Sequence, residues 1–270
     1  MQYKIGDVAR ILGISADLLR YYEKKGVVTP TKDKQNDYRY YDAWDINFLL
    51  DCLWYKSFGF GIPETACLVT DCGYSELLSM LHDKQTELKD SIHHQQMLLQ
   101  RMEHHTEEIA CVKDHLGKID ITDCPAFVRY LNRFDSSYEN SVDTQTLSKQ
   151  WLSYMPFIQR YFEMPMKQGE MRPSHYAWGF SFSMEYIHEF SVPIEPPAVT
   201  VPAATCIHSA FRSSGKNAFQ SSHVHYLYDY AEEQGLTPCG NARGNLVCSV
   251  IEQGENTGYF EVWLPIAESC

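Results

Sequence analysis

The feature that most constrains this chain is a stretch from Tyr74 to Gly117 that contains no proline, and no glycine before its last residue. It predicts one long helix over 74–117, because proline and glycine are the residues that interrupt helices. A helix of roughly 40 residues needs a partner for its apolar stripe, so we expect a dimerising coiled coil with a second copy of the chain. In the heptad register the a positions are Leu81, Leu88, Gln95, Met102, Ile109 and Leu116, and the d positions are Leu77, Lys84, Ser91, Leu98, His105 and Val112.

Short helical patterns occupy the residues before this helix. The apolar residues of 5–12 recur at helical spacing, and Ser15 is a favourable N-cap for a second helix from about Ala16 to Lys24. Two short helices joined in this way are typical of a helix-turn-helix, whose second helix ordinarily enters the major groove of DNA. With a hairpin or wing predicted over 29–41 and further helices after it, residues 1–73 are expected to form a winged-helix DNA-binding domain.

After Gly117 the pattern becomes mixed. Runs typical of strands and helices follow in the order strand, helix, strands, and this order occurs twice. We therefore expect residues 118–270 to form a domain built from a duplicated β-α-β-β unit, which makes the whole chain an α+β protein. The strand-like runs are 126–130, 176–183, 204–211, 246–251 and 258–265, and the helical runs are about 144–161 and 217–234.

The distribution of charge decides whether DNA binding is compatible with this composition. The formal net charge is −12, yet residues 1–60 carry nine Lys and Arg against eight Asp and Glu. The acidic excess therefore lies outside the first domain, where it favours neutral or cationic partners.

The sequence contains no pattern for export or membrane insertion. No apolar run approaches the roughly 20 residues of a membrane helix, and no signal-peptide pattern opens the chain. The nine cysteines include no CxxC pair, which favours free thiols in a reducing compartment. We expect a cytoplasmic protein that does not associate with a membrane.

Three segments of the first part resemble the MerR family of transcription regulators. They are Ile5-Gly6-Asp7-Val8-Ala9, Leu19-Arg20-Tyr21-Tyr22-Glu23 and Tyr38-Arg39-Tyr40-Tyr41, which match the family's first helix, recognition helix and wing in order and spacing. The last part resembles the GyrI-like effector-binding domain through Pro202-Ala203 and the runs 231–236 and 259–266. The chain as a whole resembles the BmrR-like multidrug sensors. The resemblance implies a homodimer that binds a pseudo-palindromic promoter and, with a small-molecule effector bound, distorts the promoter for RNA polymerase.

The recognition helix and the wing carry the candidate DNA-binding residues. Arg20 is expected to reach a base or a phosphate, and Arg39 fits a phosphate or the minor groove, because a guanidinium matches phosphate geometry with two donors. The tyrosines beside them either donate a hydroxyl to a phosphate or pack in the core of the domain. The candidate set is Ser15, Arg20, Tyr21, Lys24, Tyr38, Arg39 and Tyr41.

A carboxylate lies between two aromatic residues near the end of the chain. On a strand, Tyr259, Glu261 and Trp263 share one face. Burying an unpaired carboxylate is costly and aromatic faces attract organic cations, so this face either binds a lipophilic cation or lies exposed. The resemblance places Glu261 at the family's effector-binding carboxylate. The candidate effector site is Glu261, Tyr259, Trp263, Trp151, Tyr154, Trp178, Phe182 and Phe211, with core packing as the alternative for each aromatic.

An enzyme is the first competing interpretation. A hydrolase would use Glu261 with Tyr259, or with His175, His208 or His225. No GxSxG nucleophile motif is present, so we expect no catalytic activity and no cofactor.

A thiol or metal sensor is a second competing interpretation, and a DNA-architecture protein without an effector switch is a third. Cys111 and Cys124 lie at and after the end of the long helix, where a thiol or metal sensor would use them. The histidine pairs 93–94 and 104–105 do not chelate by themselves, because adjacent helical residues point about 100° apart. We expect no metal site.

Overall fold

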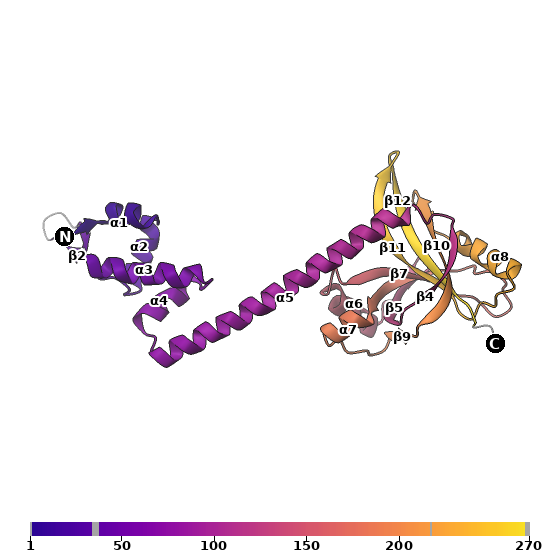
Figure 1. Ribbon diagram of the computed structural model, residues 1–270, viewed down its shortest axis with the longest axis horizontal. Helices are drawn as coiled ribbons and strands as arrows, with labels where there is room; N and C mark the ends of the chain where they lie inside the picture. Colours follow the sequence, from indigo (N-terminus) through magenta and orange to yellow (C-terminus); the bar gives the residue numbers. More distant parts are fainter. Residues whose placement is uncertain (1, 34–37, 217, 268–270) are drawn as a thin grey trace. The chain divides into compact units, whose positions relative to one another are not determined.

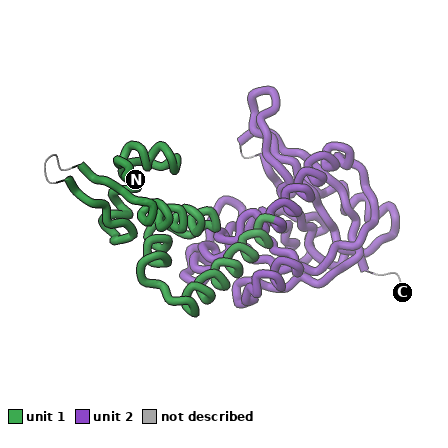
Figure 2. The backbone as a smooth tube through the Cα atoms, turned by 60° about the vertical axis from the view of Figure 1, so that its left-hand side comes forward, with its two compact units in different colours: residues 1–95 green, residues 96–270 purple. Residues whose placement is uncertain are grey.

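The structure, a computed structural model, describes residues 2–33, 38–216 and 218–267. It consists of two compact units, residues 1–95 and residues 96–270 (Figures 1 and 2). The predicted long helix is α5 (Tyr74–Val112), which begins in the first unit and ends in the second. No helix within the described ranges is long and apolar enough to cross a membrane.

The first unit is built from short helices and a small sheet. Its elements before α5 are β1 (Tyr3–Lys4), α1 (Ile5–Leu12), α2 (Ala16–Lys24), β2 (Thr31–Lys32), β3 (Arg39–Tyr41), α3 (Ala43–Ser57) and α4 (Ile62–Thr70). Gly13 ends α1 with a φ of 66°, and the Ser15 hydroxyl caps α2 by accepting a hydrogen bond from the Leu18 N–H at 3.1 Å. The predicted helix-turn-helix is present. The strand order at the predicted wing is β1-β3-β2, and residues 34–37 lie outside the described residues.

The second unit contains a large sheet in which all strand pairs are antiparallel. The strand order is β4-β10-β12-β11-β7-β8-β5-β6, and β9 pairs with β5. Its elements are β4 (Ile119–Cys124), β5 (Phe127–Phe134), β6 (Ser137–Tyr138), α6 (Val142–Leu152), β7 (Ile158–Met164), β8 (Ala177–Ser183), α7 (Met184–Glu189), β9 (Val199–Val201), β10 (Ala204–Ser214), the 3-10 helix η1 (Ser221–Val224), α8 (His225–Glu233), β11 (Ala242–Glu252) and β12 (Glu255–Pro265).

The two halves of this unit share an element order. Apart from short or connecting elements, the first half runs β5, α6, β7, β8 and the second runs β10, α8, β11, β12. In the sheet the first half lies as β7-β8-β5 and the second as β11-β12-β10, and the halves meet where β7 pairs with β11. This is the predicted order of elements, while the duplication itself stays a prediction.

The helix predicted over 144–161 is wrong in its second half. α6 ends at Leu152, and β7 begins at Ile158. Pro156 cannot continue a helix, because it has no amide hydrogen and its ring clashes with the preceding turn. The helix predicted over 217–234 is shorter than expected, since α8 begins at His225 and residue 217 lies outside the described residues. Strands β4 and β9 and helix α7 have no predicted counterpart.

Alternation of side chains along the strands separates two faces of the sheet. One face is apolar and is covered by α6, α7 and α8, which contribute Trp151, Ile187 and Leu227 to its cores. The other face carries the end of α5 (Figure 1). Val112 of α5 packs there in one cluster with Tyr259 of β12. The candidate ligand site lies on this second face.

Candidate functional site

The recognition helix α2 presents its basic side chains to solvent. Arg20 and Lys24 are exposed, and Arg20 Nη1 lies 2.6 Å from a carboxylate oxygen of Asp17 one turn earlier. Tyr21 is half-buried and packs edge-on against the neighbouring tyrosine ring. Ser15 is exposed, and its hydroxyl caps the helix. Arg20 and Lys24 are therefore the predicted residues of this helix that a phosphate or a base edge can approach directly.

An ion pair holds the wing against the recognition helix. Arg39 Nε lies 2.8 and 3.1 Å from the two carboxylate oxygens of Glu23 on α2. Tyr38 is exposed, and the Lys4 ammonium lies 5.2 Å from its ring centre. Tyr41, a predicted DNA contact, is fully buried in the core of the unit. The prediction for Tyr41 is corrected accordingly, because a side chain buried in this core cannot reach DNA.

A cavity of about 650 Å³ lies in the second unit, between the end of α5 and the second face of the sheet. This volume is in the range that accommodates drug-sized organic molecules, roughly 300–1,000 Å³. α5 contributes Gln100, Arg101, His104 and Glu108. The polar residues of the sheet are Gln159, Ser181, Ser183, Arg243, Asn245 and Glu261, and the aromatic walls include Phe127, Phe157, Tyr161, Tyr186 and Trp263.

Glu261 is an unpaired carboxyl group in the wall of this cavity. It stands on β12 opposite Asn245 of β11 and Ala210 of β10. Within the described residues it makes no hydrogen bond and no ion pair. Burial, followed by the negative charge of Glu108, raises the pKa of Glu261 to about 7. The carboxyl therefore exchanges its proton near neutral pH, and a nearby cation would favour its charged form.

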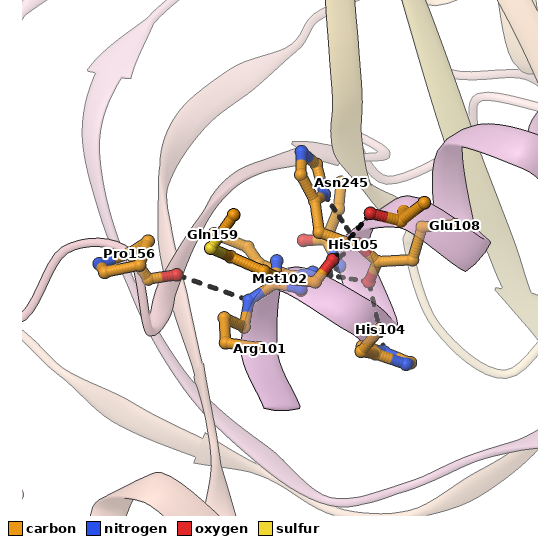
Figure 3. Close-up of polar contacts among 9 residues, drawn as sticks. Arg101, Met102, His104, His105, Glu108, Pro156, Gln159 and Asn245 are labelled. Atoms are coloured by element: carbon orange, nitrogen blue, oxygen red, sulfur yellow. Dashed lines mark hydrogen bonds and ion pairs between the residues drawn. The ribbon is translucent and has the colours of Figure 1, made fainter. Parts of the chain in front are cut away.

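Glu108 is the hub of a hydrogen-bond network on α5 (Figure 3). Its carboxylate accepts a hydrogen bond from Gln159 Nε2 at 3.0 Å and from Arg101 Nη1 at 3.3 Å. The rings of His104 and His105 approach the same carboxylate at 3.2 and 2.9 Å. One carboxylate thus gathers contacts from its own helix and from β7.

The network continues along the sheet. Asn245 Nδ2 donates to Gln159 Oε1 at 2.9 Å, and Ser181 Oγ donates to Asn245 Oδ1 at 3.0 Å. Asn245 is the cross-strand neighbour of Glu261. The polar residues beside Glu261 are therefore already hydrogen-bonded to one another, while Glu261 itself is left without a partner.

Arg243 on β11 is a basic group of the same wall. It stands opposite Trp263 of β12 and Glu163 of β7, and its guanidinium lies 5.5 Å from the centre of the Phe127 ring. Its Nε and Nη2 atoms are buried and have no hydrogen-bond partner within the described residues. Glu163 instead pairs with Arg129 at 3.2 Å. The cavity therefore contains a guanidinium without a carboxylate partner.

Two thiols meet beside Arg243. Cys124 lies at the end of β4 and lines the cavity, and Cys206 lies two residues beyond the position opposite it on β10. The neighbouring thiol of Cys206 and the charge of Arg243 lower the pKa of the Cys124 thiol, against the effect of burial. The neighbouring thiol of Cys124 and burial raise the pKa of Cys206. Cys124 is therefore the more acidic and more reactive thiol of the two.

The predicted effector residues are divided between the two faces. Glu261 and Trp263 line the cavity. Tyr259 shares their face, but it is buried under the end of α5 and its hydroxyl donates to the Glu252 carboxylate at 2.8 Å. The remaining five pack with the apolar face and do not line the cavity, because the helices that cover that face need large apolar side chains beneath them. They are Trp151, Tyr154, Trp178, Phe182 and Phe211.

Sequence reasoning missed most of the polar lining. Gln159 fell within the predicted helix, and Glu108 was not singled out on α5. Arg243 and Asn245 precede the predicted strand 246–251, but they alternate with the small residues of β11, which is a strand signal. Extending that strand backward would have placed both on one face of it.

The histidines considered for catalysis or metal binding have other contacts. His175 Nδ1 lies 2.8 Å from Asp135, and His225 Nε2 lies 2.8 Å from a backbone carbonyl; neither residue lines the cavity. His208 stacks on Trp263 with ring centres 5.2 Å apart. Among the described residues no group of three or more His, Cys, Asp or Glu is placed to hold a metal ion.

Comparison with known proteins gives matches in both sequence and structure. Residues 3–63 match a family model described as MerR HTH family regulatory protein. The HTH-type transcriptional regulator CueR of Escherichia coli is 29% identical over 45% of this chain and 88% of CueR. An uncharacterized HTH-type transcriptional regulator of Synechocystis, slr0701, is 31% identical over 43% of this chain and 77% of its own length. The cryo-EM structure of the EcmrR-DNA complex in EcmrR-RPo covers 99% of this chain and 100% of its own, with 14% identity and a TM-score of 0.37.

Proposed function

Because this chain belongs to the MerR family of helix-turn-helix regulatory proteins and is a DNA-binding transcriptional regulator, we propose that a lipophilic cation bound in the cavity controls its activity. In this proposal the protein is a cytoplasmic homodimer, and it binds a pseudo-palindromic promoter through α2 and the wing. With its effector bound, it activates transcription by distorting the promoter so that RNA polymerase can use it. In this proposal the second unit is a GyrI-like effector domain of the BmrR-like type.

The observation that carries the proposal is the unpaired Glu261 carboxyl in a cavity with aromatic walls. A buried carboxylate without a counter-charge is costly, and an organic cation would supply that charge. The faces of Trp263 and Phe127 would add cation–π attraction. The acidic excess outside residues 1–60 attracts cations over a longer range.

A second copy of the chain is the proposed partner of one side of α5. At about 100° per residue, five exposed apolar residues of α5 fall on a single side, which we call the α5 stripe. The opposite side carries Met97, Arg101 and Glu108, which pack against the other elements of the second unit. The predicted d residues Leu98 and Val112 also pack within that unit, so the stripe differs from the predicted a and d seam. The α5 stripe is Leu88, Ile92, Leu99, Met102 and Ile109.

The Glu108 network connects the proposed effector site to α5. A cation beside Glu261 would also attract Glu108, whose charge already contributes to the raised pKa of Glu261. It would compete for Glu108 with Arg101 and Gln159, so the packing of α5 and the occupancy of the cavity would depend on each other. The effector can shift this equilibrium only by binding the two states with different affinity.

In vitro transcription from the protein's own upstream promoter tests the proposal. A panel of lipophilic cations is expected to contain compounds that raise transcription by the wild type and act more weakly on Glu261→Gln, which keeps the shape but loses the charge. Glu255→Gln is the matched control, because it removes a charge from an exposed position of the same strand. Promoter binding without a response to any compound would contradict the effector part and leave the DNA-binding part intact.

The thiol in the cavity wall favours one second candidate, a regulator that responds to thiol-reactive compounds. With iodoacetamide as the probe, the Cys124 thiolate forms a sulfur–carbon bond and iodide leaves. We expect mass spectrometry to show Cys124 alkylated near pH 7, more slowly in Cys206→Ser, and Cys52 unmodified because burial raises its pKa to about 12. Loss of the transcriptional response in Cys124→Ser but not in Glu261→Gln would select this candidate.

A further inference from the structure

We infer that the ligand of this cavity carries a negative group as well as a positive one, and that Arg243 binds the negative group while Glu261 binds the positive one. The inference rests on the proposed effector-binding function and specifies the chemistry of the ligand. A lipophilic cation alone would pair with Glu261 and leave the guanidinium of Arg243, in the same wall, without a carboxylate partner among the described residues.

The register of two neighbouring strands sets the spacing of these charges. Arg243 of β11 stands opposite Trp263 of β12, and Asn245 stands opposite Glu261. Arg243 and Glu261 are therefore diagonal neighbours on one face, a relationship that typically separates Cα atoms by about 7–8 Å. No ion pair joins them in the described part of the chain. A ligand with two opposite charges at a similar spacing can contact both side chains.

Two acidic residues of this region, Glu163 and Glu108, have other partners. Glu163, its cross-strand neighbour on β7, accepts hydrogen bonds from the Tyr161 hydroxyl at 3.1 Å and from Asn241 Nδ2 at 2.7 Å, and it pairs with Arg129. The Glu108 carboxylate is held by its own network on α5.

The Arg243 guanidinium lies near the Phe127 ring and near the thiol of Cys124, which is a weak acid. Guanidinium groups bind carboxylates through parallel, charge-assisted hydrogen bonds. An entering carboxylate would therefore be a stronger partner than the thiol.

The surface between the two charges indicates a flat, apolar spacer in the ligand. Trp263 neighbours both groups, since it is opposite Arg243 and two residues from Glu261 on β12. Its ring is held by stacking on His208, with 22° between the ring planes. Aromatic rings favour stacked partners, so the ligand class is an aromatic zwitterion, with a cationic group and a carboxylate on one aromatic framework.

Two dyes that differ in one charge test this inference on the full-length protein. Rhodamine B carries a delocalised cation and a benzoate, whereas its ethyl ester keeps the cation and lacks the negative group. Fluorescence anisotropy slightly above pH 7 measures both affinities. We expect the wild type to bind rhodamine B about tenfold more tightly than the ester, which corresponds to about 1.4 kcal/mol. Arg243→Met should abolish this preference, Arg243→Lys should keep part of it, and Glu261→Gln should weaken both dyes by similar factors.

The outcomes separate this inference from the proposed function. Equal or tighter binding of the ester by the wild type would overturn the negative-group inference and leave the cation site standing. The circular dichroism melting curve of Arg243→Met shows whether this variant is folded. If the folded variant still prefers rhodamine B over the ester as strongly as the wild type does, Arg243 does not bind the negative group. If neither dye binds the folded wild type, the proposed function is contradicted. The inference is then contradicted as well, because it rests on that function.

Discussion

Glu108 of α5 accepts a hydrogen bond from Gln159 Nε2 of β7 at 3.0 Å, and this contact joins the helix to the sheet at the wall of the cavity. The Glu108 side chain is 13% exposed, and the side chain of Arg101, 3.3 Å away, is 8% exposed. Attraction between such poorly solvated charges is stronger than between charges on a surface, and the loss of one charge leaves the other buried alone. Glu108 is therefore the polar anchor of α5 on the second unit.

Replacing Glu108 with alanine tests this anchor. In this variant Arg101 would remain buried without the Glu108 carboxylate as its partner. We therefore expect the free energy of unfolding to fall by about 3 kcal/mol. Urea denaturation followed by tryptophan fluorescence measures the change. Glu107→Ala is the control, since Glu107 is exposed and should cost less than about 0.5 kcal/mol. Similar losses in the two variants would contradict the anchoring role of Glu108.

The pKa of Glu261 makes stability depend on pH. Its folded-state pKa of about 7 lies above the ordinary value of 4.5, so between these values the folded protein holds a proton that the unfolded chain has released. Stability therefore falls as pH rises through this window, by at most about 1.4 kcal/mol per pH unit. Urea denaturation of the wild type and Glu261→Gln between about pH 5 and pH 8 should show the variant gaining relative stability as pH rises. A difference that does not vary with pH would show that Glu261 keeps an ordinary pKa.

The first unit could be predicted from sequence more fully than the second, because its signals are local. Gly13, Ser15 and the helical spacing of the apolar residues define the helix-turn-helix without any distant contact. β7 could not be predicted in this way. It lies between β8 and β11, where packing from both sides decides the structure, and a short apolar run fits a helix as well as a strand.

The candidate site was predictable only in part, since alternation shows which residues share a face but not which face the helices cover. Trp178 and Phe182 share one face, and Glu261 and Trp263 share another; only the structure shows α6 and α8 on the first and α5 on the second. Glu108 had no sequence signal. Its role depends on where the end of α5 meets the sheet, which local sequence does not encode.

The ion pair between Arg39 and Glu23 allows two roles of Arg39 to be separated. If Arg39 contacts a phosphate as well as holding the wing, Arg39→Gln should weaken binding to the promoter. It should also reduce the slope of log K against log salt concentration by about 0.9, because one phosphate contact is lost. Glu23→Gln loosens the same wing but removes no cation, so it should not reduce that slope. Fluorescence anisotropy with a labelled promoter duplex over a salt series makes the comparison, and equal slopes in the two variants would restrict Arg39 to holding the wing.

The α5 stripe predicts the oligomeric state. Placing glutamates at Leu88 and Ile92 puts charge on two exposed apolar positions, so we expect light scattering coupled to size exclusion to show a monomer where the wild type is a dimer. Promoter affinity should fall steeply, because two half-sites would no longer be bound by one particle. Thr86→Glu is the control, since residue 86 is exposed and lies about 160° around the helix from residue 88. A double variant that remains dimeric would place the contact elsewhere, and the next candidates are Trp44 and Trp54 of α3, which are 69% and 64% exposed.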